Sequence, residues 1–206
     1  MHCADALPWL REQGVLAGAS IVTSLPDVTE LPGTSLDEWR AFFLEAAALV
    51  LRATPPEGAA IFFQTDAKRQ GAWVDKAYLV QRAAEECGQR LRFHKIACTQ
   101  PAGAVTFGRA AYAHLLCFSL ASSEAPSRAT ADVLPDAGAM TWVRAIGLGA
   151  CRLACRWVLE RTPTRTIVDP FCGVGTVLAA ANELGLSAVG VELNRKRAAR
   201  ARGLFL

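Results

Sequence analysis

Hydrophobic and polar positions follow two different periods along the chain. Short continuous apolar runs predict buried strands at 19–24, 58–66, 91–99, 111–120, 165–169 and 187–192. Apolar residues at helical spacing predict helices over 34–53, 74–89, 141–160, 176–185 and 194–203. Ser35 and Glu38 have capping-box spacing at the start of the first helix. The alternation of strands and helices predicts an α/β fold, a mostly parallel sheet with helices on both faces.

The length of 206 residues fits one domain. A polar, proline-containing stretch at 121–138 predicts a linker inside this domain. It separates residues 1–120 from residues 139–206. A hydrophobic content of 52% with 20% charged residues indicates a packed core and excludes a disordered chain.

Charge is distributed unevenly, although the net charge is only +3. Residues 1–140 carry 12 basic and 15 acidic side chains, a balance of −3, and residues 141–206 carry 10 and 4, a balance of +6. The basic end is compatible with a polyanionic partner. A solvated helix face would give the same balance.

The seven cysteines are odd in number, and several lie in apolar runs, which is typical of reduced thiols in a cytoplasmic protein. Cys151 and Cys155 share a helix face, but no second Cys/His pair lies nearby, so we expect no metal site. The first residues do not have the pattern of a signal peptide, and no apolar run is long enough to span a membrane.

The stretch "TIVDPFCGVGT", residues 166–176, predicts a strand that enters a glycine-rich turn and a helix. Asp169 ends the strand, at the sheet edge where open α/β folds bind ligands. Gly173 and Gly175 allow a tight turn close to a ligand. Glu192 follows Gly173 by 19 residues, near the spacing at which an acid binds ribose hydroxyls.

Two departures from the dinucleotide pattern indicate a different ligand. Leu178 stands where the third glycine would be, and the Asp169 carboxylate precedes the turn. That carboxylate would repel a pyrophosphate and attract a cationic amino-acid group. The residues therefore favour a nucleoside that carries an ammonium and a sulfonium.

"DPFCGVGT" and "GVELN" (190–194) resemble the first two motifs of S-adenosylmethionine-dependent methyltransferases, in the form used by RNA and DNA amino-methyltransferases. The resemblance implies a Rossmann-like class I methyltransferase fold and S-adenosyl-L-methionine as cofactor. It assigns motif residues to cofactor binding: Asp169, Pro170, Phe171, Gly173, Gly175, Thr176, Glu192 and Asn194.

The motifs lie near the end of the sequence, as in circularly permuted members of these methyltransferases. Under that interpretation "ADALPWL" is similar to the third motif, and Asp5 would contact the adenine amino group. "AMTWVRAIGLGAC" resembles the segment that precedes the first motif, so Met140 is expected beside the methionine end of the cofactor. The resemblance then covers nearly the whole chain.

The catalytic motif of the family is expected at "TSLPD", where Ser24 fits the first position and Pro26 the third. Leu25 replaces a proline, and Asp27 replaces the aromatic residue that stacks on the target base. We expect Ser24, Pro26 and Asp27 to be catalytic, with Asp27 accepting a proton from the methyl acceptor.

"QTDAKRQGAWVDK" (64–76) combines basic residues with a tryptophan, which suits phosphate contacts and base stacking. The predicted substrate-binding residues are Lys68, Arg69, Trp73 and Lys76.

The sequence thus favours a nucleic-acid methyltransferase, with RNA (tRNA or rRNA) preferred to DNA and with a protein partner or homodimer as a means of targeting. Two alternatives stay open because "TSLPD" is altered. One is a methyltransferase for a small molecule or a protein, and the other is a cofactor-binding partner subunit without catalysis.

Overall fold

Seven strands form the central sheet of the computed structural model, which describes residues 1–121, 130–143 and 145–206. In sheet order they are β7 (Val133–Leu134), β5 (Arg90–Cys98), β6 (Tyr112–Ser119), β2 (Ala60–Gln64), β1 (Ala19–Thr23), β8 (Thr166–Asp169) and β9 (Ser187–Gly190). Only β6 runs antiparallel to its neighbours. The predicted mostly parallel α/β sheet is therefore confirmed.

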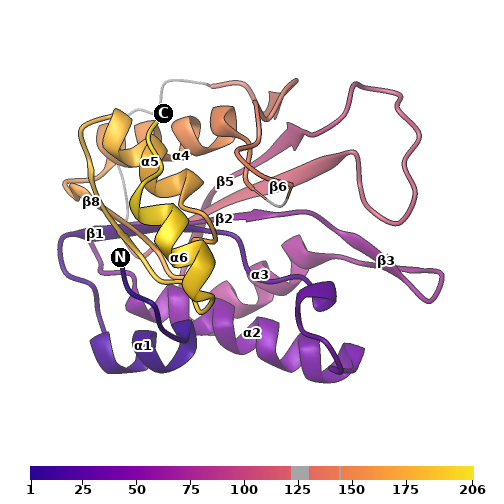
Figure 1. Cartoon of the computed structure of the whole chain (residues 1–206), viewed down its shortest axis with the longest axis horizontal. Coiled ribbons are helices and arrows are strands. Elements are labelled where there is room, and N and C mark those ends of the chain that lie inside the picture. Colours follow the sequence, from indigo (N-terminus) through magenta and orange to yellow (C-terminus); the bar gives the residue numbers. More distant parts are fainter. Residues whose placement is uncertain (122–129, 144) are drawn as a thin grey trace.

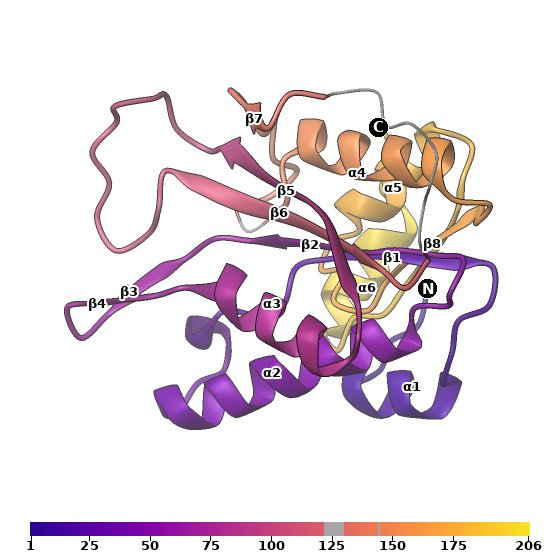
Figure 2. The ribbon, with the colours of Figure 1, turned by 180° about the vertical axis from the view of Figure 1, so that it is seen from behind.

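Helices cover both faces of this sheet (Figures 1 and 2). One layer holds α1 (Ala6–Gln13), α2 (Leu36–Ala53) and α3 (Lys76–Glu86), and the other holds α4 (Leu148–Arg161) and α5 (Thr176–Glu183), beside which lies α6 (Arg195–Arg202). Adjacent strand residues point to opposite faces. Ile21 of β1 accordingly packs in the core of the first layer, and Val22 packs in the core of the second.

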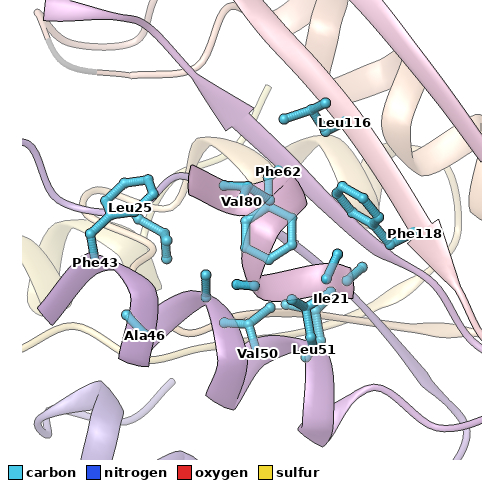
Figure 3. Packing of buried hydrophobic residues seen from close by; sticks show 14 of the residues in the cluster. Ile21, Leu25, Phe43, Ala46, Val50, Leu51, Phe62, Val80, Leu116 and Phe118 are labelled. Carbon is cyan, nitrogen blue, oxygen red and sulfur yellow. The ribbon is translucent and has the colours of Figure 1, made fainter. Parts of the chain in front are cut away.

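The core between the sheet and α2 is built from large, fully buried side chains (Figure 3). Phe43 and Val50 of α2 belong to one buried cluster with Phe62 and Phe118 of the sheet. The capping box of Ser35 and Glu38 is present at the start of α2, as predicted. Among the described residues, no helix is long and apolar enough to cross a membrane.

The helix predicted over 141–160 is wrong in its first part, because α4 begins only at Leu148. Residues 137–139 cross the start of the helix, where Ala150 N donates to Ala137 O at 3.0 Å. A Cβ atom on Gly147 would lie 2.2 Å from Ala137 O, so the close crossing requires glycine. Residues 141–143 are therefore not helical, and Trp142 lies with residues from the carboxyl ends of β1 and β8 in the site described below.

Two irregular stretches also differ from the prediction. Residues 64–76 contain a hairpin of β3 (Ala67–Arg69) and β4 (Ala72–Val74), in which Gln70 and Gly71 both have positive φ. The turn therefore suits a short β-hairpin. The predicted linker includes strand β7, which pairs with β5, and its residues 122–129 lie outside the described residues.

The strands β1 and β8 are neighbours although they come from opposite ends of the chain. From β1 the chain continues through α2 to β2, on one side of this pair. From β8 the chain continues through α5 to β9, which lies on the other side of the β1–β8 pair. The helix α5 covers the face of the sheet opposite to that covered by α2. Connections that diverge in this way open a crevice at the carboxyl ends of the two strands, where α/β proteins bind ligands.

Candidate active site

Asp169 lies at the carboxyl end of β8, with only 3% of its surface exposed. Its Oδ1 atom accepts hydrogen bonds from Thr23 Oγ1 at 2.7 Å and from Phe171 N at 3.1 Å. Burial raises the pKa of Asp169 to about 7, although both hydrogen bonds favour the ionised form. A nearby cation would restore the charge of this carboxylate.

The glycine-rich turn after Asp169 has two glycines with different roles. Gly173 has φ of 56° and lies against Trp142, since a Cβ atom at Gly173 would come within 3.1 Å of the indole ring. Gly175 has φ of 88° and begins α5. A Cβ atom there would lie 3.0 Å from Ala201 Cβ, so Gly175 permits contact between α5 and α6 and does not line the crevice.

The opposite wall of the crevice comes from the end of β9 and from the first residues of the chain. Glu192 is 8% exposed, and its Oε1 atom accepts from Asn194 N at 2.8 Å. Asn194 caps α6, and Asp5 caps α1 by accepting from Leu7 N. His2 pairs in parallel with Val191, which brings Asp5 beside this wall.

These residues enclose a cavity of about 510 Å³, hereafter the first cavity. This volume lies within the usual range for ligand pockets. Ten of the predicted site residues line it, namely Asp5, Ser24, Pro26, Asp169, Pro170, Phe171, Gly173, Thr176, Glu192 and Asn194. Met140 does not line it; the same segment contributes Trp142, which sequence reasoning missed. The Arg197 guanidinium lies 5.1 Å from the centre of the Trp142 ring.

A second cavity, of about 320 Å³, shares Ser24, Leu25 and Ile146 with the first. Asp27 lines this second cavity. Met140 also lines it, whereas the sequence predicted Met140 beside the cofactor in the first cavity. The remaining wall comes from the end of β2, the start of α3, the loop 99–110 and residues 136–143 and 145–147. Ser24 therefore stands at the junction of two spaces, which suits a site where two ligands meet.

Asp27 is held by contacts on both carboxylate oxygens. Lys76 Nζ lies 2.5 Å from Oδ2, and Arg69 and both donor groups of Thr29 contact Oδ1. Burial by itself would raise the pKa of Asp27, but the Lys76 charge and the hydrogen bonds from Lys76 and Thr29 hold the pKa well below its ordinary value. A carboxylate with so low a pKa accepts protons poorly, which argues against Asp27 as a general base, and the expected role stays a prediction.

Leu25 explains one departure from the expected catalytic motif. The side chain is 3% exposed and packs in the core beside Phe43 of α2 (Figure 3). Trp39, also on α2, donates from Nε1 to Pro26 O at 3.1 Å. The loop after β1 is thus fixed by a buried leucine and a tryptophan hydrogen bond, where the family pattern has a second proline.

The predicted substrate residues separate into two groups. Arg69 and Lys76 reach Asp27, and Lys76 lines the second cavity. Lys68 and Trp73 face each other across the β3–β4 hairpin, outside both cavities.

The hairpin extends away from the helix layers in both views (Figures 1 and 2). Residues 108–110 pair with it, since Lys68 N donates to Gly108 O at 2.8 Å and Ala67 pairs with Arg109. We call residues 67–74 and 105–110 the projecting arm. Phe107 in this arm is 94% exposed and lies between Thr106 and Arg109, which both line the second cavity. The sequence pattern gave no reason to select Phe107.

One group of metal-type ligands occurs among the described residues. Carboxylate oxygens of Asp66 and Asp75 and a ring nitrogen of His114 lie within 4.8 Å of one another. Asp66 accepts from Lys76 N and lies 3.0 Å from His114 Nε2, and Asp75 caps α3. These bonds fix the base of the hairpin to α3 and β6, so we interpret the group as structural.

Comparisons with known proteins agree with this arrangement. Residues 158–202 match a family described as DNA methylase. A putative DNA modification methylase from Thermus thermophilus (TTHA0409), solved with S-adenosyl-L-methionine, is 22% identical with a TM-score of 0.74, over 98% of this chain and 92% of that one. The M1.HpyAVI–SAM complex is 16% identical with a TM-score of 0.62, over 100% and 98%.

The cytosine-N4-specific PvuII DNA methyltransferase is also 16% identical, with a TM-score of 0.74 over 98% of this chain and 84% of that one. A search of curated proteins gives no significant match. These matches name DNA methylases, so they do not support the expected preference for RNA. The structural likeness extends over nearly the entire chain, and the chain has the class I methyltransferase fold.

Proposed function

We propose that the chain is an S-adenosyl-L-methionine-dependent methyltransferase that acts on an amino group of DNA. The observation that carries the proposal is the first cavity, where Asp169, Gly173 and Glu192 converge at the divergence point of an α/β sheet. The matched DNA methylase family and the solved structures with S-adenosylmethionine support the same cofactor.

The donor groups of the first cavity fit this cofactor. The Glu192 carboxylate suits the ribose hydroxyls, and Asp5, at the start of α1, suits the adenine amino group. The buried Asp169 carboxylate suits the cationic methionine end, because a bound cation repays the cost of burying its charge. Trp142 closes the cavity over the glycine-rich turn.

The methyl group of a bound sulfonium is already activated, so placement of the acceptor supplies much of the acceleration. Ser24 borders both cavities and is positioned to accept a hydrogen bond from the acceptor amine. With the cofactor bound, transfer would form a nitrogen–carbon bond as the sulfur–carbon bond breaks, and the amine proton would pass to water. Asp27 contributes by fixing the loop after β1 through Lys76 and Arg69.

A nucleic-acid acceptor is supported by the projecting arm. Lys68 and Arg109 provide positive charge, Phe107 provides an exposed aromatic face beside Thr106 of the second cavity, and Trp73 provides another on the hairpin. Phosphate contacts from basic side chains combined with stacking of bases on aromatic rings are how proteins hold an unstacked nucleotide. Phe107 is better placed than Asp27 or Trp73 to replace the missing aromatic of the catalytic loop.

The test is methyl transfer from labelled cofactor to duplex DNA, single-stranded DNA and RNA, followed by mass spectrometry of the nucleosides. Labelled methylamino-deoxynucleosides are expected from DNA, and the Asp169→Asn variant should give much less label at a limiting cofactor concentration. Label in ribonucleosides alone would reverse the choice of acceptor. Cofactor binding without transfer to any nucleic acid would favour a small-molecule enzyme or a non-catalytic subunit.

Circular permutation is a further part of the proposal. The first residues pair beyond β9, and Arg202 of α6 lies 3.4 Å from Met1 O, so the two ends of the sequence contribute to one sheet edge. Joining Leu206 to Met1 by a flexible linker and opening the chain after the exposed Ala121 should give a folded protein that binds cofactor. Insoluble products from several linker lengths would count against the permuted order.

A further inference from the structure

Gln64 is a buried polar residue with an unused hydrogen-bonding group. It ends β2, where four apolar residues precede it, and 1% of its surface is exposed. Its Nε2 atom has no hydrogen-bond partner among the described residues. An unpaired buried amide is unfavourable, because its hydrogen bonds to water are lost and not replaced. Packing alone therefore does not explain a glutamine at this position.

The location of Gln64 points to a ligand. The residue lines the second cavity together with Ser24 and Leu25. Since Thr23 pairs with Phe62, Gln64 stands two residues beyond that pair, at the sheet edge that Asp169 and Ser24 also occupy. The terminal amide of glutamine turns at little cost, so either its oxygen or its nitrogen can face the cavity. The other polar side chains of this wall include Thr99, Gln100 and Thr106.

A primary amide presents a donor and an acceptor side by side. An amino group next to an unprotonated ring nitrogen presents the complementary pair, and glutamine binds such an edge of adenine through two hydrogen bonds. Cytosine has the same arrangement of amino group and ring nitrogen. Thymine has no amino group to methylate.

We propose that Gln64 determines base specificity by pairing its amide with the methylated amino group and the adjacent ring nitrogen of the target base. This inference rests on the proposed function, because it takes the second cavity as the acceptor pocket. The hydrogen bond that Gln64 Nε2 lacks in the free protein is then made only with the correct base. An apolar residue at this position would bind a base without reading its edge.

The test compares Gln64→Leu and Gln64→Glu with the wild-type enzyme on DNA duplexes. Each substrate has a partner in which the ring nitrogen beside the amino group is replaced by carbon, 3-deazacytosine for cytosine and 1-deazaadenine or 7-deazaadenine for adenine. We expect Gln64→Leu to lower kcat/KM for the natural base about 10- to 100-fold. Cofactor affinity should change less than about twofold, because Gln64 does not line the first cavity.

The deaza substrates distinguish recognition from a general defect. The wild-type enzyme should lose activity on the relevant deaza base, whereas Gln64→Leu should use the natural and deaza bases almost equally. Gln89→Leu is the matched control, since Gln89 is also buried but lies outside both cavities. That variant should keep the wild-type preference for the natural base. If Gln64→Leu is poorly folded, Gln64→Glu supplies the same comparison, because it keeps the shape and loses the donor.

Unchanged kcat/KM in both Gln64 variants, or an unchanged preference against the deaza bases, would overturn this inference and leave the proposed function intact. A wild-type enzyme that binds cofactor and methylates no nucleic acid would overturn the proposed function, and the inference with it. Failure of the inference is therefore seen when the Gln64 variants are compared with the wild type, whereas failure of the proposed function is seen in the wild-type enzyme itself.

Discussion

The two cavities meet at Ser24 but differ in how they are built. The first is formed mainly by residues from three short stretches, at the ends of β1, β8 and β9, together with the start of α1. The second draws on β2, α3, the loop 99–110 and residues 136–143 and 145–147, which carry no recognisable motif. A cavity whose main residues lie in recognisable motifs is readable from sequence, whereas one built from segments without a motif depends on how those segments pack.

The cavities also differ in their charged groups. In the first, no cationic side chain among the described residues is bonded to the buried Asp169, and burial raises its pKa to about 7. In the second, Asp27 is buried against Lys76 and Arg69, and its pKa is held low. Asp169 is thus suited to pair with a cationic group of a ligand, whereas Asp27 is already paired with Lys76 and Arg69.

The largest expected effect is on stability, from breaking the pair in the second cavity. Lys76→Met leaves the Asp27 charge buried, so the free energy of unfolding should fall by about 3–5 kcal/mol in urea titrations. Arg69→Met removes a more exposed cation from the same carboxylate and should cost about 0–1 kcal/mol. If both variants lose the same free energy of unfolding, the burial of Lys76 does not make its ion pair with Asp27 stronger than that of Arg69.

Activity of Asp27→Asn tests its proposed role in positioning the loop. The loss of turnover should parallel the loss of stability, and the pH dependence of kcat should keep its shape, because the pKa of Asp27 lies below the working range. A well-folded Asp27→Asn variant that loses roughly 100-fold in turnover, with one limb of the pH profile removed, would restore Asp27 as the general base.

The corresponding change in the first cavity is Asp169→Asn, which removes the negative charge and keeps the shape. We expect cofactor affinity to fall by about 10- to 100-fold, the loss expected when a charge-assisted contact is removed. Calorimetry measures the affinity, and Asp37→Asn on the exposed side of α2 is the control. Unchanged affinity in Asp169→Asn would remove the assignment of the cofactor's cationic end.

The pH dependence of cofactor binding sharpens the same contrast. The ionised form of Asp169 binds a cation, and its raised pKa means that the carboxyl holds a proton in much of the free protein below pH 7. Affinity should therefore decrease by up to about tenfold per pH unit below 7 and level off above about pH 8. Asp169→Asn should abolish this slope between pH 5 and 8, and an equal slope in the variant would assign it to another group.

The smallest effect is expected on the projecting arm. Lys68→Ala should weaken DNA binding several-fold and reduce the salt dependence of binding by the equivalent of about one phosphate contact. Lys196→Ala, on the exposed start of α6, should leave that dependence unchanged. Fluorescence anisotropy over a series of salt concentrations measures both. A reduced slope only in Lys196→Ala would place the DNA on the basic C-terminal surface instead.

Much of the fold and of the first cavity was determined by the sequence alone. Apolar runs predicted β1, β2, β5, β6, β8 and β9, and helical periods predicted most helices, because burial on a sheet face imposes those periods directly. The short strands β3, β4 and β7 were not predicted. Asp169, Gly173 and Glu192 were found for a related reason: one strand–turn–helix unit and the next strand place them at one sheet edge by local geometry.

Only the tertiary structure decided how the second cavity is formed. Asp27 looks like a free acid in its own segment, and Lys76, which holds its charge, lies 49 residues away. Trp142, Gln64 and Phe107 carry no local pattern that marks them, because their roles depend on which distant segments cross beside them. Helix and strand periods report contacts between neighbours in sequence, whereas a cavity wall assembled from several elements is set by packing between residues far apart in the chain.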